Sequence, residues 1–223
     1  AMNVQSLVFA SIVALAGPVS TAPSQAADAA ANDGLVAVQS RNLDEFYLRL
    51  KADLGGFRRI MIEPATVEFR KDWLRDMNDT RSVTRRLDPD DAKRIADAAA
   101  TSMGARVADA FKARGFEIVT APGAGVLRLS PSVADLDVYA PDVSSPGITR
   151  SYTRDAGEAT LLLEARDATT GALLVRVVDR NTAREIGRIN RTTSVSNDLW
   201  FDAMFRHWAS NCAREIEAIQ NRP

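Results

Sequence analysis

The sequence predicts an α/β (α+β) fold, in which a mixed, mainly antiparallel sheet of about four to five strands carries two long packed helices. Three observations predict it. Residues 157–180 form two β-rich runs around one tight turn, two long segments have a helical apolar period, and the elements follow the order strand, helix, several strands, helix.

The composition favours one domain. A chain of 223 residues, 46% of them apolar, has material for one core. We expect a single α/β domain over 27–223, of which 27–56 is a linker and N-terminal arm. Lys and Arg total 28 against 29 for Asp and Glu, so there is no positive excess to attract nucleic acid, and we expect no such partner.

The first 26 residues have the pattern of a secretory signal. Leu7–Gly17 is an apolar run shorter than the ~20 residues that span a bilayer, and small residues follow it up to Ala26. We expect a signal peptide over 1–26 and no transmembrane span in the mature chain. The first six residues lack the usual Lys or Arg. The alternative, a buried N-terminal helix, is disfavoured by Gly17 and Pro18.

The single cysteine, Cys212, limits which cysteine modifications the chain can carry. It lies far from the apolar run, so lipid attachment there is excluded, and no disulfide can form within the chain. We expect an unlipidated periplasmic protein of a Gram-negative bacterium. His207, the only histidine, lies about 500° from Cys212 around a helix, so the two do not stack as a catalytic pair. We predict no catalytic residue, metal ligand or cofactor.

The first half of the mature chain contains an arm, a strand and a helix. Asn42–Lys51 fits an extended arm or a short helix, and Arg59–Phe69 is rich in β-formers, with Pro64 marking a bend or an edge. A helix should run from Pro89 to Arg114, because Asp88 can cap it and Gly115 can end it. Its apolar face comprises Ala92, Ile95, Ala96, Ala99, Met103, Val107, Ala110 and Phe111.

The second half supplies more strands and the last helix. Phe116–Thr120 and Gly125–Ser130 are expected strands, the latter extending through Leu136, and 142–152 is an expected loop. After the hairpin and a polar connection over 181–196, Ser196 or Asn197 caps a helix. Its apolar stripe comprises Phe201, Met204, Phe205, Trp208, Cys212, Ile216 and Ile219.

The next question is which face of the predicted hairpin is exposed to solvent. If Asp167 pairs with Ala172, strict alternation gives one face Leu161, Leu163, Ala165, Leu174, Arg176 and Val178. The other face then receives Thr160, Leu162, Glu164, Arg166, Leu173, Val175, Val177 and Asp179. We expect the first face to contact the helices. The second needs a cover, because Leu162, Leu173, Val175 and Val177 would expose apolar surface. Either the segment 34–56 covers it or a partner does.

A second candidate for partner binding is the run Phe69-Arg70-Lys71-Asp72-Trp73. An aromatic ring flanked by Arg and Lys suits a protein groove or an anionic glycan. The alternative, which we prefer, has Trp73 closing the end of the core while Arg70 and Lys71 are solvated. Two weaker motifs remain. The glycine-rich Pro122–Gly125 is similar to a phosphate-binding loop, but it leads into an expected strand instead of a helix. Asp135, Asp137 and Asp142 could offer oxygen ligands to Ca²⁺, but without EF-hand spacing we interpret them as surface carboxylates.

Several motifs together resemble an uncharacterised family of bacterial envelope proteins and lipoproteins, domain of unknown function 3313. The resemblance runs from about Asp33 to Ile219 and rests on Asp33–Val36, Ala52–Phe57, Ile60–Pro64, Glu68–Trp73, Pro122–Leu129, Ala156–Leu161, Asp167–Gly171, Asp179–Arg180 and Trp208–Ala209. It implies an exported protein and supplies no catalytic residues. The missing N-terminal cysteine departs from the lipoprotein members.

Our functional expectation is therefore a non-enzymatic module of the periplasm or cell envelope. It would bind an envelope protein, or itself as a homo-oligomer, through a sheet face or edge. The competing hypothesis is an enzyme that acts on an envelope component, which a cleft with displaced pKa values would favour.

Overall fold

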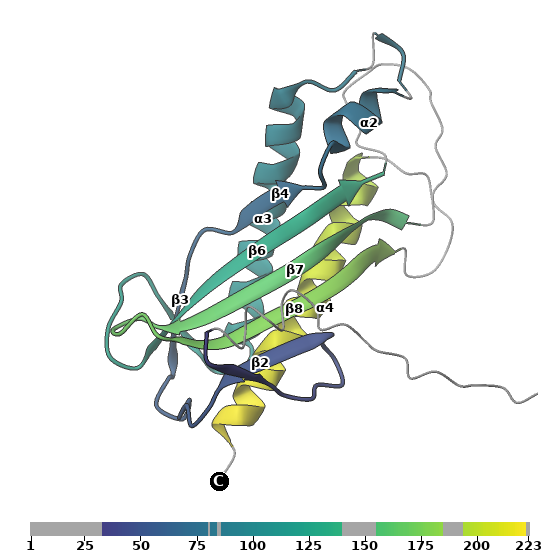
Figure 1. Ribbon diagram of the computed structural model, residues 1–223. Helices are drawn as coiled ribbons and strands as arrows, with labels where there is room; N and C mark the ends of the chain where they lie inside the picture. Colours follow the sequence, from purple (N-terminus) through teal and green to yellow (C-terminus); the bar gives the residue numbers. More distant parts are fainter. Residues whose placement is uncertain (1–32, 80, 84–85, 140–154, 185–193, 222–223) are drawn as a thin grey trace, which may run out of the picture.

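The computed structural model describes residues 33–79, 81–83, 86–139, 155–184 and 194–221. One eight-stranded mixed sheet forms the centre of the molecule, with the order β1-β2-β8-β7-β6-β3-β5, and β4 pairs with β6 beyond the end of β3 (Figure 1). The strands are β1 (Leu35–Ala37), β2 (Glu45–Arg49), β3 (Arg59–Ile62), β4 (Thr66–Phe69), β5 (Glu117–Val119), β6 (Val126–Val138), β7 (Asp155–Asp167) and β8 (Leu173–Arg184).

The predicted four to five strands are an undercount. The expected strand over 59–69 is two strands, β3 and β4, which run parallel to β6 and are separated by the segment that contains Pro64. The N-terminal arm over 34–56 is extended and contributes the strands β1 and β2. Both are antiparallel, and β2 pairs with β8, so the arm widens the sheet at its edge.

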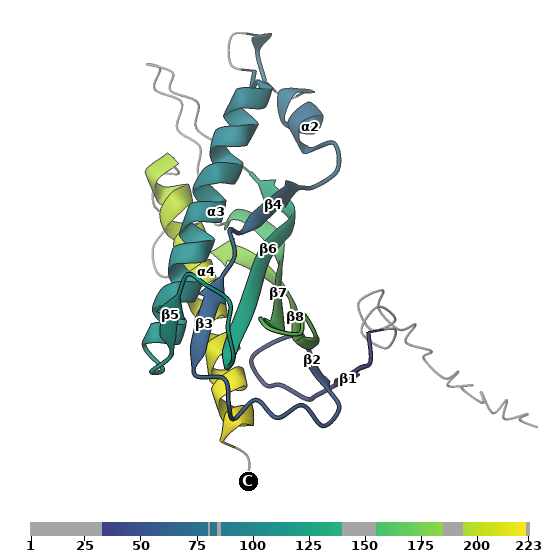
Figure 2. The same ribbon diagram turned by 90° about the vertical axis from the view of Figure 1, so that its left-hand side faces the viewer.

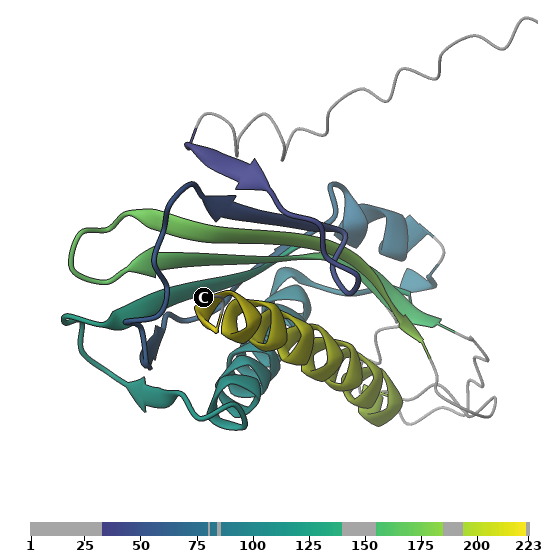
Figure 3. The same cartoon turned by 90° about the horizontal axis from the view of Figure 1, so that it is seen from below.

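Both long helices lie on one face of this sheet (Figures 2 and 3). Helix α3 (Pro89–Lys112) begins where expected: the Asp88 carboxylate accepts from the Asp91 amide at 2.8 Å, and the Asp91 carboxylate accepts from the Asp88 amide at 2.9 Å. Helix α4 (Ser194–Gln220) begins slightly earlier than predicted. Asp202 of α4 accepts hydrogen bonds from Ser102 and Arg106 of α3, which joins the two helices.

The core lies between the helices and the sheet. In α3, Met103, Val107 and Phe111 are fully buried, and every residue of the predicted α4 stripe is buried, including Cys212. A short helix that the sequence did not predict, α2 (Trp73–Asp79), lies at the end of the sheet beside β4 (Figure 1). No helix in the described part of the chain is long and apolar enough to cross a membrane.

Candidate functional site

The sheet has two different faces. Along β6 and β7, buried side chains such as Leu129, Val133, Leu161 and Leu163 point toward α3 and α4. The alternate side chains point away from both helices, and none of the described helices covers that side (Figure 2). We call this side the open face. Its residues on the three long strands are Arg128, Ser130, Ser132, Ala134, Thr160, Leu162, Glu164, Arg166, Leu173, Arg176, Val178 and Arg180.

The prediction of an apolar strip on the second face is wrong for Val175 and Val177 of β8. Asp167 does pair with Ala172, the condition on which the two faces were assigned, since the Asp167 amide donates to the Ala172 carbonyl at 3.0 Å. The ladder then shifts register, because Ala165 pairs with Val175 while Arg166 pairs with Leu173. This bulge reverses the alternation in β8 alone. Val175 and Val177 therefore enter the core with no exposed surface, and Arg176 and Val178 move to the open face.

The other two apolar candidates lie on the open face. Leu173 is only 3% exposed because it packs with Leu35 of β1 and Tyr47 of β2 in a small separate cluster. The arm thus covers this end of the face, one of the two covers expected from the sequence. Leu162 is half-buried between its neighbours in the ladder, Ser132 and Val178.

Ion pairs dominate the middle of the open face. Glu164 accepts from Nε and Nη2 of Arg176 at 3.0 and 2.7 Å and from Nη2 of Arg166 at 2.8 Å. Arg176 also donates to Asp33 at 2.6 Å. Burial opposes the ionisation of Glu164, but the hydrogen bonds from the two arginines outweigh it and hold the pKa of Glu164 below its ordinary value.

A second polar group continues this network onto β3. Glu63, which follows β3, accepts from the hydroxyl of Ser130 and lies 3.5 Å from Nε of Arg128. Arg128 and Arg166 are partners in the β6–β7 ladder, as are Ser130 and Glu164. Acidic and basic side chains therefore lie next to one another across four strands, and we call this part of the open face the lattice.

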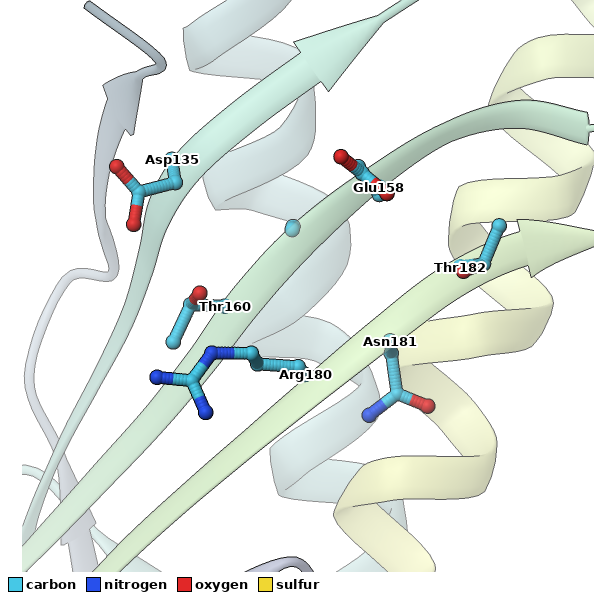
Figure 4. Close-up of a pocket in the computed structure, with 7 residues that line it drawn as sticks. Asp135, Glu158, Thr160, Arg180, Asn181 and Thr182 are labelled. Atoms are coloured by element: carbon cyan, nitrogen blue, oxygen red, sulfur yellow. The ribbon is translucent and has the colours of Figure 1, made fainter. Parts of the chain in front are cut away.

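Beyond the lattice, the open face has a groove of about 190 Å³ (Figure 4). It lies on β6, β7 and β8, toward the end of the sheet opposite the β7–β8 turn. We call it the distal groove. Its lining residues are Asp135, Glu158, Ala159, Thr160, Arg180, Asn181 and Thr182.

Two backbone irregularities shape the distal groove. The β6–β7 ladder shifts register between Ala134 and Asp137, and Asp135 within that bulge has a φ of 51°. Opposite it, Gly157 has a φ of 156°, and a Cβ there would lie 2.1 Å from the carbonyl oxygen of Asp137. Only glycine permits this approach of the two strands. Neither feature follows from hydrophobic alternation, so the groove could not be predicted from the sequence.

Three charged side chains of both signs line the distal groove, namely Asp135, Glu158 and Arg180. Asp135 and Glu158 are exposed, and neither carboxylate has a hydrogen-bond or ion-pair partner among the described residues. Arg180 is 66% exposed, and its guanidinium lies 3.9 Å from the Glu45 carboxylate, at the edge of ion-pair distance. In contrast, neighbouring Asp137 accepts from Nε of Arg70 at 2.7 Å.

The aromatic run at 69–73 mostly serves the fold. Trp73 is buried, stacks on Phe69 with ring centroids 4.2 Å apart, and donates its indole N–H to the Val138 carbonyl at 3.1 Å. Trp73 therefore closes the end of the core, the reading preferred from the sequence. Arg70 bridges Asp76 and Asp137, which raises the pKa of Arg70, and Lys71 is exposed.

The structure places the other chemical motifs away from the open face. Cys212 is buried, and burial raises the pKa of its thiol well above the ordinary value, so it remains a neutral thiol. His207 is exposed on α4. Pro122–Gly125 leads into β6, and Asp142 lies outside the described residues. The described residues contain no cluster of three His, Cys, Asp or Glu side chains that could hold a metal.

Comparison with known proteins gives a family and distant fold relatives. A family model described as "Protein of unknown function (DUF3313)" matches residues 25–212. No curated protein matches the chain.

Similar solved structures include a PelC dodecamer from Paraburkholderia phytofirmans, which is 12% identical with a TM-score of 0.38 and is matched over 77% of this chain and 94% of that chain. Protein XCC0632 from Xanthomonas campestris is 10% identical with a TM-score of 0.38, over 72% of this chain and 87% of that chain. At these TM-scores the likeness carries no argument about function.

Proposed function

We propose that this chain, which belongs to the DUF3313 family of proteins of unknown function as its motifs predicted, is an exported, non-enzymatic binding module of the bacterial cell envelope. Its binding surface is the open face of the sheet. The observation that carries this proposal is the difference between the two faces: one is closed by α3 and α4, and the other presents a fixed polar surface that ends in the distal groove.

The rigidity of the open face supports this role. Its side chains project from long paired strands, and the ion pairs of Glu164, Arg166 and Arg176 fix their positions. A surface of this kind loses little conformational freedom when a partner docks, so more of the contact energy appears as affinity. One solvated face is ordinary for antiparallel strands, so the groove and its exposed charged side chains, more than the exposure itself, favour binding.

Export is proposed from the N-terminal pattern. The signal-like segment over 1–26 precedes the described domain, and the family match begins at residue 25, next to the proposed cleavage position after Ala26. A non-enzymatic role fits the buried, neutral thiol of Cys212, since a thiolate is needed for a cysteine nucleophile.

Site-specific photo-crosslinking in a Gram-negative host tests the proposal. A photoreactive residue replaces Ser132 on the open face, and the matched control replaces Ala218, which is exposed on α4. We expect a discrete crosslinked adduct in the periplasmic fraction from position 132 only. The proposal fails if position 132 gives no adduct, if both positions give the same adducts, or if the chain is retained in the cytoplasm.

A further inference from the structure

We propose that two facing carboxylates, Asp44 and Asp179, make the attachment of the N-terminal arm to β8 depend on pH, so that the arm is held more firmly in mild acid than at neutral pH. We call these two residues the carboxylate pair. This inference goes beyond the proposed function and does not depend on it, because the attachment can be measured on purified protein without a partner.

The carboxylate pair lies where the arm joins the rest of the sheet. β1 pairs with β2, and β2 joins the sheet by pairing with β8, beside which it lies (Figure 1). Glu45 is the partner of Val178 at one end of this ladder, so the same register places Asp44 opposite Asp179. The pair therefore closes the β2–β8 ladder at that end.

Each carboxylate of the pair holds the backbone of the opposite strand. The Asp179 carboxylate accepts from the Asp44 amide at 3.0 Å, and the Asp44 carboxylate accepts from the Arg180 amide at 2.9 Å. These two hydrogen bonds continue the attachment of the arm past the last ladder pair. The arm that they hold covers Leu173 on the open face.

The same arrangement brings two like charges together. Like charges directly opposite each other on antiparallel strands are destabilising. Asp44 is exposed, but Asp179 is only 7% exposed, so burial opposes the charge of Asp179. In the described part of the chain neither carboxylate has an ion-pair partner, and the Arg180 guanidinium lies 3.9 Å from the Glu45 carboxylate instead.

Helix α4 offers the pair little compensating charge. His207 attracts the charge of Asp179, but it is exposed to solvent, which weakens the attraction. Cys212 is a buried neutral thiol. Glu215 is acidic and accepts from the Ser40 hydroxyl at 2.9 Å. The negative charge of Asp179 is therefore poorly balanced when the arm is closed.

Protonation relieves this imbalance. Burial is the largest cause that raises the pKa of Asp179, and the charge of Asp44 adds to it. When the arm opens, Asp179 regains water and loses its charged neighbour, so its pKa falls toward the ordinary value of about 3.9. Between these two values the closed state binds more protons than the open state. Opening therefore becomes more favourable as the pH rises through this window.

Hydrogen–deuterium exchange of the purified protein, followed by mass spectrometry between about pH 4 and pH 7, tests the inference. Division by the intrinsic exchange rate at each pH gives the protection of each segment. The amides of β2 report on the arm, and those of β7 report on the centre of the sheet. Phe46 of β2 is buried in the core, so the open state is a minor one, which exchange can detect.

Three variants accompany the wild type. Asp179→Asn keeps a hydrogen-bond acceptor for the Asp44 amide but carries no charge. Asp53→Asn is the matched control in the arm, because the Asp53 carboxylate accepts from the Gly55 amide in its own turn. His207→Gln tests whether the histidine, instead of the carboxylate pair, controls the attachment.

In the wild type we expect the β2 amides to be less protected than those of β7. Their protection should fall by up to about tenfold per pH unit as the pH rises through the window, which is the limit for one proton. Asp179→Asn should abolish this dependence on pH, whereas Asp53→Asn and His207→Gln should retain it. Equal protection of β2 and β7, persistence of the dependence in Asp179→Asn, or its loss in either control overturns the inference.

Asp44→Asn tests the other member of the pair and decides the matter if circular dichroism shows that Asp179→Asn does not fold. Asparagine keeps an acceptor for the Arg180 amide and removes the charge that faces Asp179. We expect a weaker dependence of β2 protection on pH than in the wild type, because burial of Asp179 remains. A dependence as steep as that of the wild type overturns the role of the pair.

Discussion

Oε1 of Glu164 accepts hydrogen bonds from both Nε and Nη2 of Arg176, at 3.0 and 2.7 Å, across the β7–β8 ladder in which the two residues are direct partners. The Arg176 side chain is 13% exposed, so this pair is the most enclosed of the open-face ion pairs. It exists because the bulge after Leu173 turns Arg176 away from the helices.

We predict that Glu164→Gln destabilises the protein by about 1–3 kcal/mol at neutral pH, because the enclosed Arg176 keeps only Asp33 as its acidic partner. The pKa of Glu164 is lowered in the folded protein, so its contribution is present above the unfolded pKa of about 4.3 and is lost as the pH falls through the folded value. Urea unfolding of both proteins measures this. A difference in stability that is equal at neutral and strongly acidic pH contradicts the assignment.

The contribution of Asp179 to folding stability should change with pH in the opposite direction to that of Glu164. It is buried beneath α4, where burial and the nearby Asp44 raise its pKa despite hydrogen bonds from the Asp44 amide and Asn181. Between the unfolded and folded pKa values the folded state binds more protons, so stability falls as the pH rises through this window. We expect the stability of Asp179→Asn relative to the wild type to increase as the pH rises above the unfolded pKa of about 3.9. Thermal unfolding measures this, and a relative loss contradicts it.

The register shift in β8 is tested by comparing two substitutions that strict alternation places on the same face. Val177→Asp puts a charge into the core and should unfold the protein, whereas Leu162→Asp on the open face should leave it folded. Circular dichroism and size-exclusion chromatography distinguish these outcomes. If both variants remain folded, Val177 does not face the helices as described.

Gly157 should be irreplaceable. Gly157→Ala places a methyl group against the Asp137 carbonyl and the Phe201 ring, and we expect a loss of at least about 2–3 kcal/mol. Gly104, in α3, is the matched control, because a Cβ there meets nothing within 4 Å. Gly104→Ala should raise stability by up to about 1 kcal/mol. Denaturant unfolding gives both values, and a tolerated Gly157→Ala would contradict the close approach of β6 and β7.

Elements with strong local signals were predictable from the sequence. The Asp88 cap and the three- and four-residue spacing define α3, and the spacing defines α4 with its buried stripe. The turn after Asp167 was also predictable, because the Asp167 carboxylate accepts from the Thr169 and Thr170 amides and Gly171 has a positive φ. These features depend on residues close together in the chain.

The remainder depends on contacts between distant residues. β1 has three residues, too few for a periodic pattern, and it forms because β2 offers it an edge. The bulge after Leu173 cannot be recognised in the sequence, because β8 has apolar residues on both faces and their alternation does not reveal the extra residue. The distal groove likewise requires three strands in their final register, so its residues could not be selected from the sequence.

The most direct test of the account is cysteine labelling with a membrane-impermeant maleimide, because it reports export and masking of the open face together. The buried Cys212 should stay unlabelled, so Ser132→Cys and Ala218→Cys each add one reactive site. We predict that both label rapidly in purified protein, and that in the host periplasm Ala218→Cys still labels rapidly while Ser132→Cys is protected. Equal labelling of the two positions in cells, or labelling of neither before lysis, would contradict the account.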